Sequence, residues 1–181
     1  SWLGPAQAVK RHEQDVAACR AKDANGPRLA LHLTVLAGAR SQAGDDDGAE
    51  AAYSEALKIQ RAAAAGAVAN SPLASPAHVA FFHRCLARLH ERSGQFDKAE
   101  QDYRDWKALY AAHFPNKPTA VVDPQLSLAN FLAGQGKLEA AQREYQELVK
   151  VVQACGDDRL AGRYLYYLGM LNWHLDEPEV A

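Results

Sequence analysis

The feature of this sequence that most limits its possible folds is an internal repeat. Three segments align on a glycine without a gap, and a fourth follows with Asp176 in the place of the glycine. The segments are residues 36–57, 86–106 and 128–148, aligned on Gly44, Gly94 and Gly136, and then residues 168–181. A pattern that recurs at this scale indicates one supersecondary unit used several times.

Each copy carries the same residue types at the same distances from this turn position. Leucine lies eight positions before it and is followed by a small residue, and alanine lies five positions after it. Tyrosine lies nine positions after it in the three complete copies. The residues are Leu36, Leu86, Leu128 and Leu168; Ala37, Ala87, Ala129 and Gly169; Ala49, Ala99, Ala141 and Ala181; Tyr53, Tyr103 and Tyr145.

This pattern predicts a pair of antiparallel helices in each copy. The small residue and the alanine suit a close crossing of two helices, and the tyrosine follows the alanine by one helical turn. Glycine suits the reversal of the chain because it adopts positive φ without strain. A single hairpin leaves an apolar face that only a stacked neighbour can bury. We therefore expect an all-α array of stacked hairpins.

Prolines and capping residues indicate where the helices begin. Ser75 and Asp123 each precede a proline suited to the first helical position, and the acidic residues 45–47 suit another helix start. The Ala-rich residues 62–69 are expected to prolong one second helix. The expected helices span about residues 5–23, 28–43, 46–68, 77–93, 96–113, 124–134, 138–155 and 159–175, with one more opening at 177.

The register of small residue, turn glycine, alanine and aromatic residue resembles the signature of the tetratricopeptide repeat (TPR) over about residues 29–181. Successive turn positions are 50, 42 and 40 residues apart, longer than the usual period of about 34. Periods near 42 are similar to those of the kinesin light chain class. The resemblance implies a right-handed superhelical solenoid of antiparallel helical hairpins that serves as a protein-interaction scaffold.

We expect the chain to divide along these repeats, and because it begins with Ser1 and stops within a repeat, we expect it to be a segment of a longer protein. The expected parts are residues 1–26, an N-terminal helix that is a cap or half of a preceding repeat; 27–75, repeat 1 with a long second helix and an Ala/Pro-containing connector; 76–121, repeat 2; 122–157, repeat 3; and 158–181, an incomplete repeat 4.

Charge and composition argue against several classes of partner. A net charge of -2 and a pI near 6.4 provide no field that attracts nucleic acid or an anionic membrane. No apolar run approaches the roughly 18 residues of a membrane span. We therefore expect a soluble, cytoplasmic protein. The three cysteines form no CxxC pair, so they are expected to be reduced and mostly buried thiols.

No motif indicates catalysis, a cofactor or a metal. His83 and His90 lie two helical turns apart, about 10 Å along a helix, which is too far to share one ion. We interpret them as surface or groove histidines, and His32 and His174 as packed between helices. The acidic residues 45–47 lack the ligand spacing of a calcium loop. Nucleotide-binding, hydrolase and metalloprotease motifs do not occur, so we expect no enzyme.

Binding residues are expected on the first helix of each hairpin, because these helices line the concave face of a TPR array. Positions 13, 10, 6 and 3 before the turn share one helical face. The candidate groove residues at these positions are Phe81, Arg84, Arg88, Asn130, Arg163, Tyr166, Met170 and Trp173. Arginine binds carboxylates, asparagine can hold a peptide backbone, and aromatic rings cover apolar anchors. The hypothesis is a groove for a peptide with acidic and apolar residues.

Two alternatives stay open. The arginines can be solvated surface residues that pair with neighbours such as Glu91. The segment can also be the regulatory or sensor arm of a larger enzyme whose catalytic domain lies outside it. RNA binding is disfavoured by the repeat period and the charge. The Lys/Asn pattern of chaperone-tail binders and the Asn-Asn pair of the kinesin light chain class are not matched here, so neither ligand is carried over.

Overall fold

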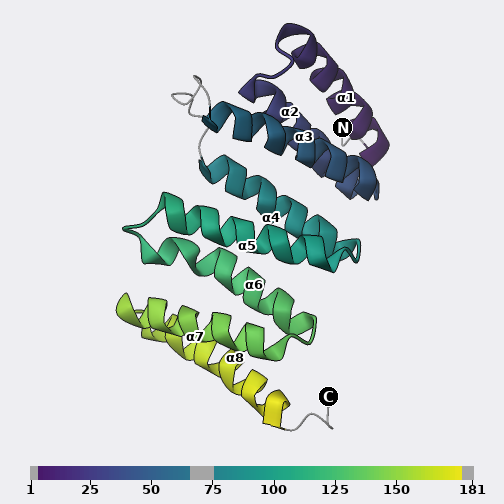
Figure 1. Cartoon of the computed structure of the whole chain (residues 1–181). Coiled ribbons are helices and arrows are strands. Elements are labelled where there is room, and N and C mark those ends of the chain that lie inside the picture. The colour runs from purple at the N-terminus through teal and green to yellow at the C-terminus, as the bar shows by residue number, and fades with distance from the viewer. Residues whose placement is uncertain (1–3, 66–75, 177–181) are drawn as a thin grey trace. The chain divides into compact units, whose positions relative to one another are not determined.

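A computed structural model describes residues 4–65 and 76–176 of the chain, and every regular element within these ranges is a helix (Figure 1). The elements are α1 (Pro5–Lys22), α2 (Pro27–Gln42), α3 (Asp46–Ala65), α4 (Pro76–Arg92), α5 (Phe96–His113), the 3₁₀ helix η1 (Pro118–Val121), α6 (Val122–Gly134), α7 (Leu138–Ala154) and α8 (Asp158–Asp176). The chain divides into two compact units, Ser1–Asp102 and Tyr103–Ala181.

The eight helices agree with the expected ones to within a few residues, with one real difference. We predicted that α6 begins at Pro124, with Asp123 as its cap, but this was wrong, because η1 leads directly into α6 and the helix begins at Val122. Pro124 fits inside the first turn because the amide groups there have no partner within the helix. The end of the predicted helix 46–68, Ser75 as a cap and the helix opening at 177 lie outside the described residues.

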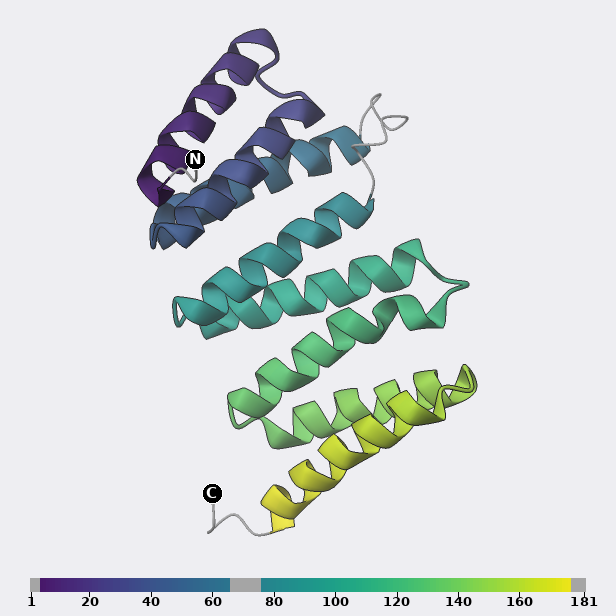
Figure 2. The same cartoon turned by 180° about the vertical axis from the view of Figure 1, so that it is seen from behind.

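Unit 1 is built from neighbouring antiparallel helices. α2 packs against α1 on one side and against α3 on the other, and α3 packs against α4. Figure 2 shows α2 and α3 side by side along most of their lengths from behind. The start of α5 joins this unit because Asp102 accepts hydrogen bonds from His83 and His90 of α4.

The recurring small residues lie where the helices of a hairpin cross, as predicted. Their side chains have no exposed surface in the complete copies: Ala37, Ala87, Ala129, Ala49, Ala99 and Ala141 are all 0% exposed. The leucines that precede the first group are also buried, at 4% for Leu36 and Leu86 and 0% for Leu128. A larger side chain at these alanines would push the two helices apart. The repeat register therefore describes real packing.

The turn glycines adopt the conformation that the pattern requires. Gly44, Gly94 and Gly136 have φ of +82°, +73° and +70°. After each of them the next amide reaches back to the last turn of the first helix, as from Gln95 N to the His90 carbonyl at 2.8 Å. The second helix of the first hairpin is then capped by Asp45, whose Oδ1 accepts a 2.9 Å hydrogen bond from the amide of Gly48. This confirms the capping role predicted for the acidic run.

Unit 2 contains η1, α6, α7 and α8 with most of α5, and α7 packs against both α6 and α8. Tyr103 is 4% exposed, and its ring lies 5.4 Å from that of Phe131 between centroids. Gln125 is 3% exposed and its amide donates to the carbonyl of Glu144 at 3.2 Å, which links α6 to α7. The first contact joins successive hairpins, and the second joins the two helices of one hairpin.

The cysteines are free thiols, but the expectation that they are mostly buried was wrong. Cys19 is buried, Cys85 is partly exposed and Cys155 is exposed. Cys155 follows the last residue of α7, where the chain turns at Gly156.

Candidate functional site

A cavity of about 540 Å³ opens between α2, α3 and α4 in unit 1. α2 and α4 are the first helices of the hairpins that turn at Gly44 and Gly94, so the cavity lies on the helices that the sequence assigned to ligand binding. Its walls mix polar and apolar groups. The lining residues are Gly38, Ser41, Gln42, Tyr53, Cys85, Arg88, Leu89, Glu91 and Arg92.

The recurring tyrosine contributes to this cavity. A Cβ built on Gly38 would lie 3.9 Å from the Tyr53 hydroxyl, so the small residue at this point of α2 leaves the phenol accessible. The Tyr53 hydroxyl interacts with the Cys85 thiol on α4, and both residues line the cavity. Burial, together with the neighbouring thiol, raises the pKa of Tyr53 to about 12, so the phenol is a neutral donor at physiological pH.

Of the three predicted groove residues of α4, Arg88 lines the cavity, and Phe81 and Arg84 do not. Arg88 is exposed, and it makes no hydrogen bond or ion pair with the part of the chain that the structure describes. The guanidinium carbon of Arg84 lies 5.1 Å from the centre of the Phe81 ring, a cation–π contact one helical turn apart. Burial raises the pKa of the Cys85 thiol, and the charges of Arg84 and Arg88 only partly offset this.

Arg92 was missed by sequence reasoning. Its guanidinium bonds the carboxylate of Asp46 on α3 and the hydroxyl of Ser41 on α2, the latter at 2.8 Å. It therefore joins three helices at one end of the cavity. The sequence could have indicated the α2 side of the cavity. Gly38 and Ser41 lie six and three residues before Gly44, which are two of the positions used to choose candidate residues in the later hairpins.

The remaining candidate residues lie in unit 2, on α6 and α8. Asn130 is exposed on α6, and its Oδ1 accepts a hydrogen bond from the Tyr145 hydroxyl. On α8, Tyr166, Met170 and Trp173 are 64%, 45% and 47% exposed, on one face as predicted. Arg163 lies 5.3 Å from the Tyr164 ring and lines a smaller cavity of about 400 Å³ with Asp157, Arg159 and Leu160.

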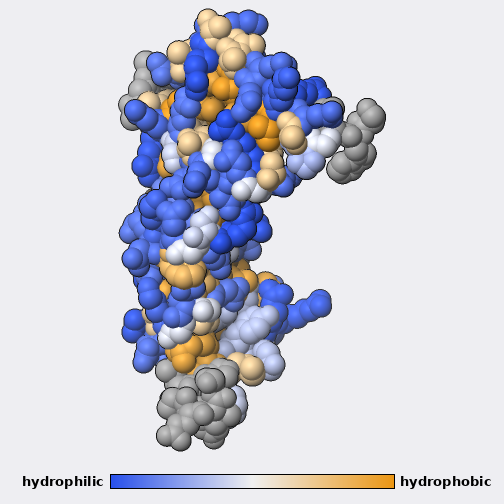
Figure 3. Space-filling view, turned by 90° about the vertical axis from the view of Figure 1, so that its right-hand side faces the viewer, coloured by the Kyte–Doolittle hydropathy of each residue, from blue (hydrophilic) through white to orange (hydrophobic). Residues whose placement is uncertain are grey.

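The adjoining face of α8 is also exposed. Leu165 is 46% exposed and Gly169 is exposed, whereas the equivalent residues of α6, Gln125 and Ala129, are buried against α7. Figure 3 shows hydrophobic surface in this α7–α8 region beside the grey C-terminal residues. Ala181, which the repeat register places opposite Gly169, lies outside the described residues.

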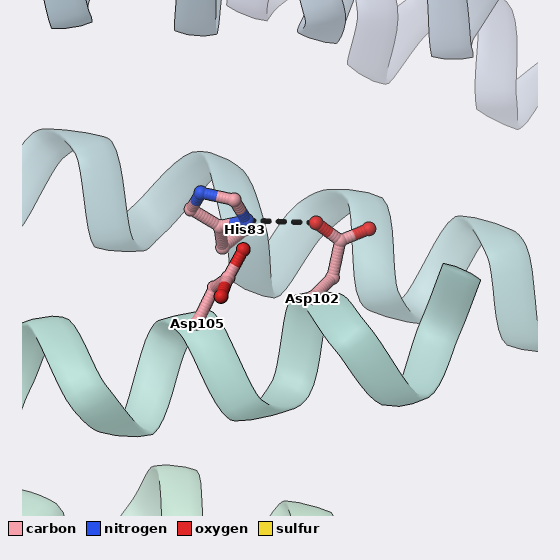
Figure 4. A group of neighbouring side chains, drawn as sticks. All are labelled: His83, Asp102 and Asp105. Carbon is pink, nitrogen blue, oxygen red and sulfur yellow. Dashed lines mark hydrogen bonds and ion pairs between the residues drawn. The ribbon is translucent and has the colours of Figure 1, made fainter. Parts of the chain in front are cut away.

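The interpretation of His83 and His90 as surface or groove residues was wrong. They are only 2% and 5% exposed, because they lie on the stripe of α4 that contains Ala87 and faces α5. Both Nδ1 atoms bond the carboxylate of Asp102, at 2.7 Å from His83 to Oδ1 and 2.8 Å from His90 to Oδ2. Figure 4 shows the His83 ring beside that carboxylate, with Asp105 three residues further along α5.

Of the other histidines considered, His32 is partly buried on α2. The side chain of His174 lies outside the described residues. No helix of the described ranges has the length and apolar character that a membrane crossing requires.

Comparisons with known proteins bear on the fold. No protein-family model and no curated protein matches this chain. Among solved structures, BtubC (BKLC) from P. vanneervenii is similar, with a TM-score of 0.67 and 21% identity over 99% of this chain and 69% of that chain. A Podosopora anserina protein described as a putative kinesin light chain with nearly identical TPR-like repeats has a TM-score of 0.62 and 18% identity, covering 93% of this chain and 87% of that chain.

A substituted variant of the Podosopora anserina protein gives the same TM-score and identity, over 96% of this chain and 89% of that chain. The two Podosopora anserina structures are described as having TPR-like repeats, which agrees with the helical hairpins found here from burial and turn geometry. The chain therefore has the fold of a TPR-like repeat protein.

Proposed function

We propose that this chain is a protein-interaction scaffold that binds a peptide segment on the first helices of its hairpins, with the cavity beside Arg88 as an anchoring point. TPR-like folds generally serve as protein-interaction scaffolds, and this supports the proposal. The single observation that supports it is the 540 Å³ cavity between α2, α3 and α4, whose lining includes the exposed Arg88 together with Ser41 and Tyr53.

The chemistry of the cavity favours a carboxylate-bearing peptide. Arg88 makes no ion pair with a described residue, so its guanidinium is available to a carboxylate without first breaking an internal contact. The Ser41 hydroxyl and the Gln42 amide add donors from the facing helix. Aspartate or glutamate on a ligand therefore fits this point of the surface.

Apolar side chains beside the cavity suit an apolar anchor on the same ligand. Leu31 and Val35 on α2 are 40% and 50% exposed, and they lie two turns and one turn before Gly38, respectively. Phe81 lies in the same direction along α4 from Arg88. A peptide whose acidic residue reaches Arg88 would then cover these side chains with an apolar one.

Selection from a random-peptide library tests the proposal. We expect the 181-residue chain to enrich peptides that carry acidic and apolar residues. Arg88→Glu should weaken the binding of a selected peptide by at least tenfold, as expected for a lost charge-assisted contact of about 1.5–3 kcal/mol. The matched control is Arg143→Glu, the same charge reversal on α7. Equal weakening by both variants, or none by either, would refute this site.

A further inference from the structure

Five charged or polar side chains form a partly buried network across α3, α4 and the start of α5 in unit 1. Asp102 accepts hydrogen bonds from His83 and His90. On the α3 side, the Nη2 of Arg61 lies 2.8 Å from His83 Nε2, and Glu50 Oε1 lies 3.2 Å from His90 Nε2. The network therefore connects the second helices of two successive hairpins through the first helix of the later one.

The two histidines have different partners. Arginine can only donate, so Nε2 of His83 accepts from Arg61 and its Nδ1 donates to Asp102. His90 has a carboxylate oxygen opposite each ring nitrogen. A neutral ring would place an unprotonated nitrogen next to one of these oxygens in a site that is 5% exposed. Only the imidazolium carries a charge that attracts both carboxylates.

We propose that His90 carries a proton as part of the native structure, and that this imidazolium makes the packing of α3, α4 and the start of α5 in unit 1 dependent on pH. The two carboxylates that it faces come from different helices, Glu50 on α3 and Asp102 on α5. Loss of the proton leaves two buried or half-buried carboxylates with one fewer positive charge between them.

The other charged groups around His90 are compatible with this. On α5, Lys98 Nζ lies 3.0 Å from the same Glu50 oxygen, and Gln95 Nε2 donates to the other oxygen at 3.3 Å. Lys98 is largely exposed, so its charge is screened by solvent. The contact between His90 Nε2 and Glu50 lacks hydrogen-bond geometry, so it is an ion pair that needs the charge of the ring.

The fold itself does not require a polar residue at this point. Four residues before its turn, the third hairpin has Leu132, which is 1% exposed, where the second has His90. Eleven residues before its turn, the first hairpin has the buried Leu33 where the second has His83. Leucine thus fills each position in a neighbouring hairpin, and the histidine–carboxylate network is a specific addition to one hairpin.

The pKa values of the groups agree with this assignment. Burial alone would lower the pKa of His90, but the bonds to Asp102 and Glu50 outweigh it and raise the pKa above the ordinary 6.5. Likewise, burial would raise the pKa of Asp102, but His83 and His90 hold it below its ordinary value. The native state therefore retains a proton on His90 at pH values where the unfolded chain has released it.

Titration of the histidine ring signals by NMR on the 181-residue chain tests the proposal. The His90 signal is assigned by its absence in His90→Gln, and we expect its midpoint above the ordinary value. Glu50→Gln removes one of the two carboxylates at a partly exposed residue that keeps the fold, so the midpoint should fall. Glu55→Gln, on the same helix but paired with Arg20, should leave it unchanged.

Chemical unfolding at different pH values gives a second readout. Because unfolding releases one proton from His90 between its ordinary and native midpoints, the unfolding equilibrium constant should rise up to about tenfold per pH unit there. The same rise should be absent from His90→Gln. A wild-type His90 midpoint at or below the ordinary value, or a midpoint that Glu50→Gln does not move, would overturn the proposal.

Discussion

The hydroxyl of Tyr145 donates a hydrogen bond to the side-chain oxygen of Asn130, six residues before the turn of the same hairpin. In the first hairpin the equivalent tyrosine, Tyr53, has its hydroxyl beside Gly38, which is also six residues before the turn. In these two hairpins the recurring tyrosine thus reaches from the second helix to the residue six positions before the turn on the first one. The hydroxyl bonds an asparagine at that position in one hairpin and lies beside a glycine in the other.

Removal of this hydroxyl should destabilise unit 2 modestly. We expect Tyr145→Phe to lower the free energy of unfolding by about 0.5–1.5 kcal/mol, because a part-buried hydrogen bond is lost while the exposed Asn130 can be hydrated instead. Tyr166→Phe changes the same group at a residue that is 64% exposed and should have almost no effect. Urea unfolding followed by circular dichroism gives both values. Equal effects would show that the hydroxyl contributes nothing specific.

The recurring leucine should be among the most sensitive residues. Leu128 is 0% exposed, so Leu128→Ala leaves a cavity between helices and should lower the free energy of unfolding by about 2–5 kcal/mol. Leu165→Ala removes the same atoms from a side chain that is 46% exposed, and a change of about 0.5 kcal/mol or less is expected. A large effect at Leu165 would show that this face of α8 is covered in solution.

Replacement of glycine by alanine should lower the free energy of unfolding at a turn glycine and raise it at a glycine within a helix. Gly94→Ala forces a side chain into a residue with φ of +73° and should lower the free energy of unfolding by about 1–2 kcal/mol. Gly162 lies within α8 with no atom near its missing Cβ, so Gly162→Ala should raise it by about 0.5–1 kcal/mol. Thermal unfolding of the two variants beside the wild type shows the signs directly.

Acid should weaken unit 1 through its paired carboxylates. The pKa of Asp102 lies below its ordinary 3.8, and that of Glu50 below its ordinary 4.5, although burial acts in the opposite direction for both. Their contribution is therefore present above the ordinary values and is lost as the pH falls through the lowered native ones. Chemical unfolding from neutral to strongly acidic pH should show this loss, and Asp102→Asn should show less of it. An unchanged acid profile in Asp102→Asn would contradict the pairing.

The sequence was enough to predict the hairpins because their packing is local and repeated. Ala49, Ala99 and Ala141 each lie five residues after a turn glycine. The simplest reason is that two helices cross at this position too closely for a larger side chain. The start of α6 was not predicted, since the 3₁₀ turn at Pro118–Val121 carries no cap residue that distinguishes it from a loop.

The polar network of unit 1 shows the limit of this reasoning. His83 and His90 lie one turn on either side of Ala87, which should have indicated that they face α5 and not the groove. Their shared partner Asp102 could not be identified in the same way, because the pairing depends on the rotation of α5 against α4. The sequence predicted only part of the cavity lining. Arg88 was among the predicted residues. The bond from Arg92 to Asp46 was not predicted, because it joins residues 46 positions apart in the sequence.

The position of a bound peptide tests the central claim most directly. A photo-crosslinking residue placed at Gln42, which lines the cavity on α2, should capture a library-selected peptide, whereas the same residue at the exposed Gln146 of α7 should not. An excess of unlabelled peptide should abolish the crosslink at Gln42. A peptide that crosslinks at Gln146 and not at Gln42 would place the binding surface elsewhere and contradict the account.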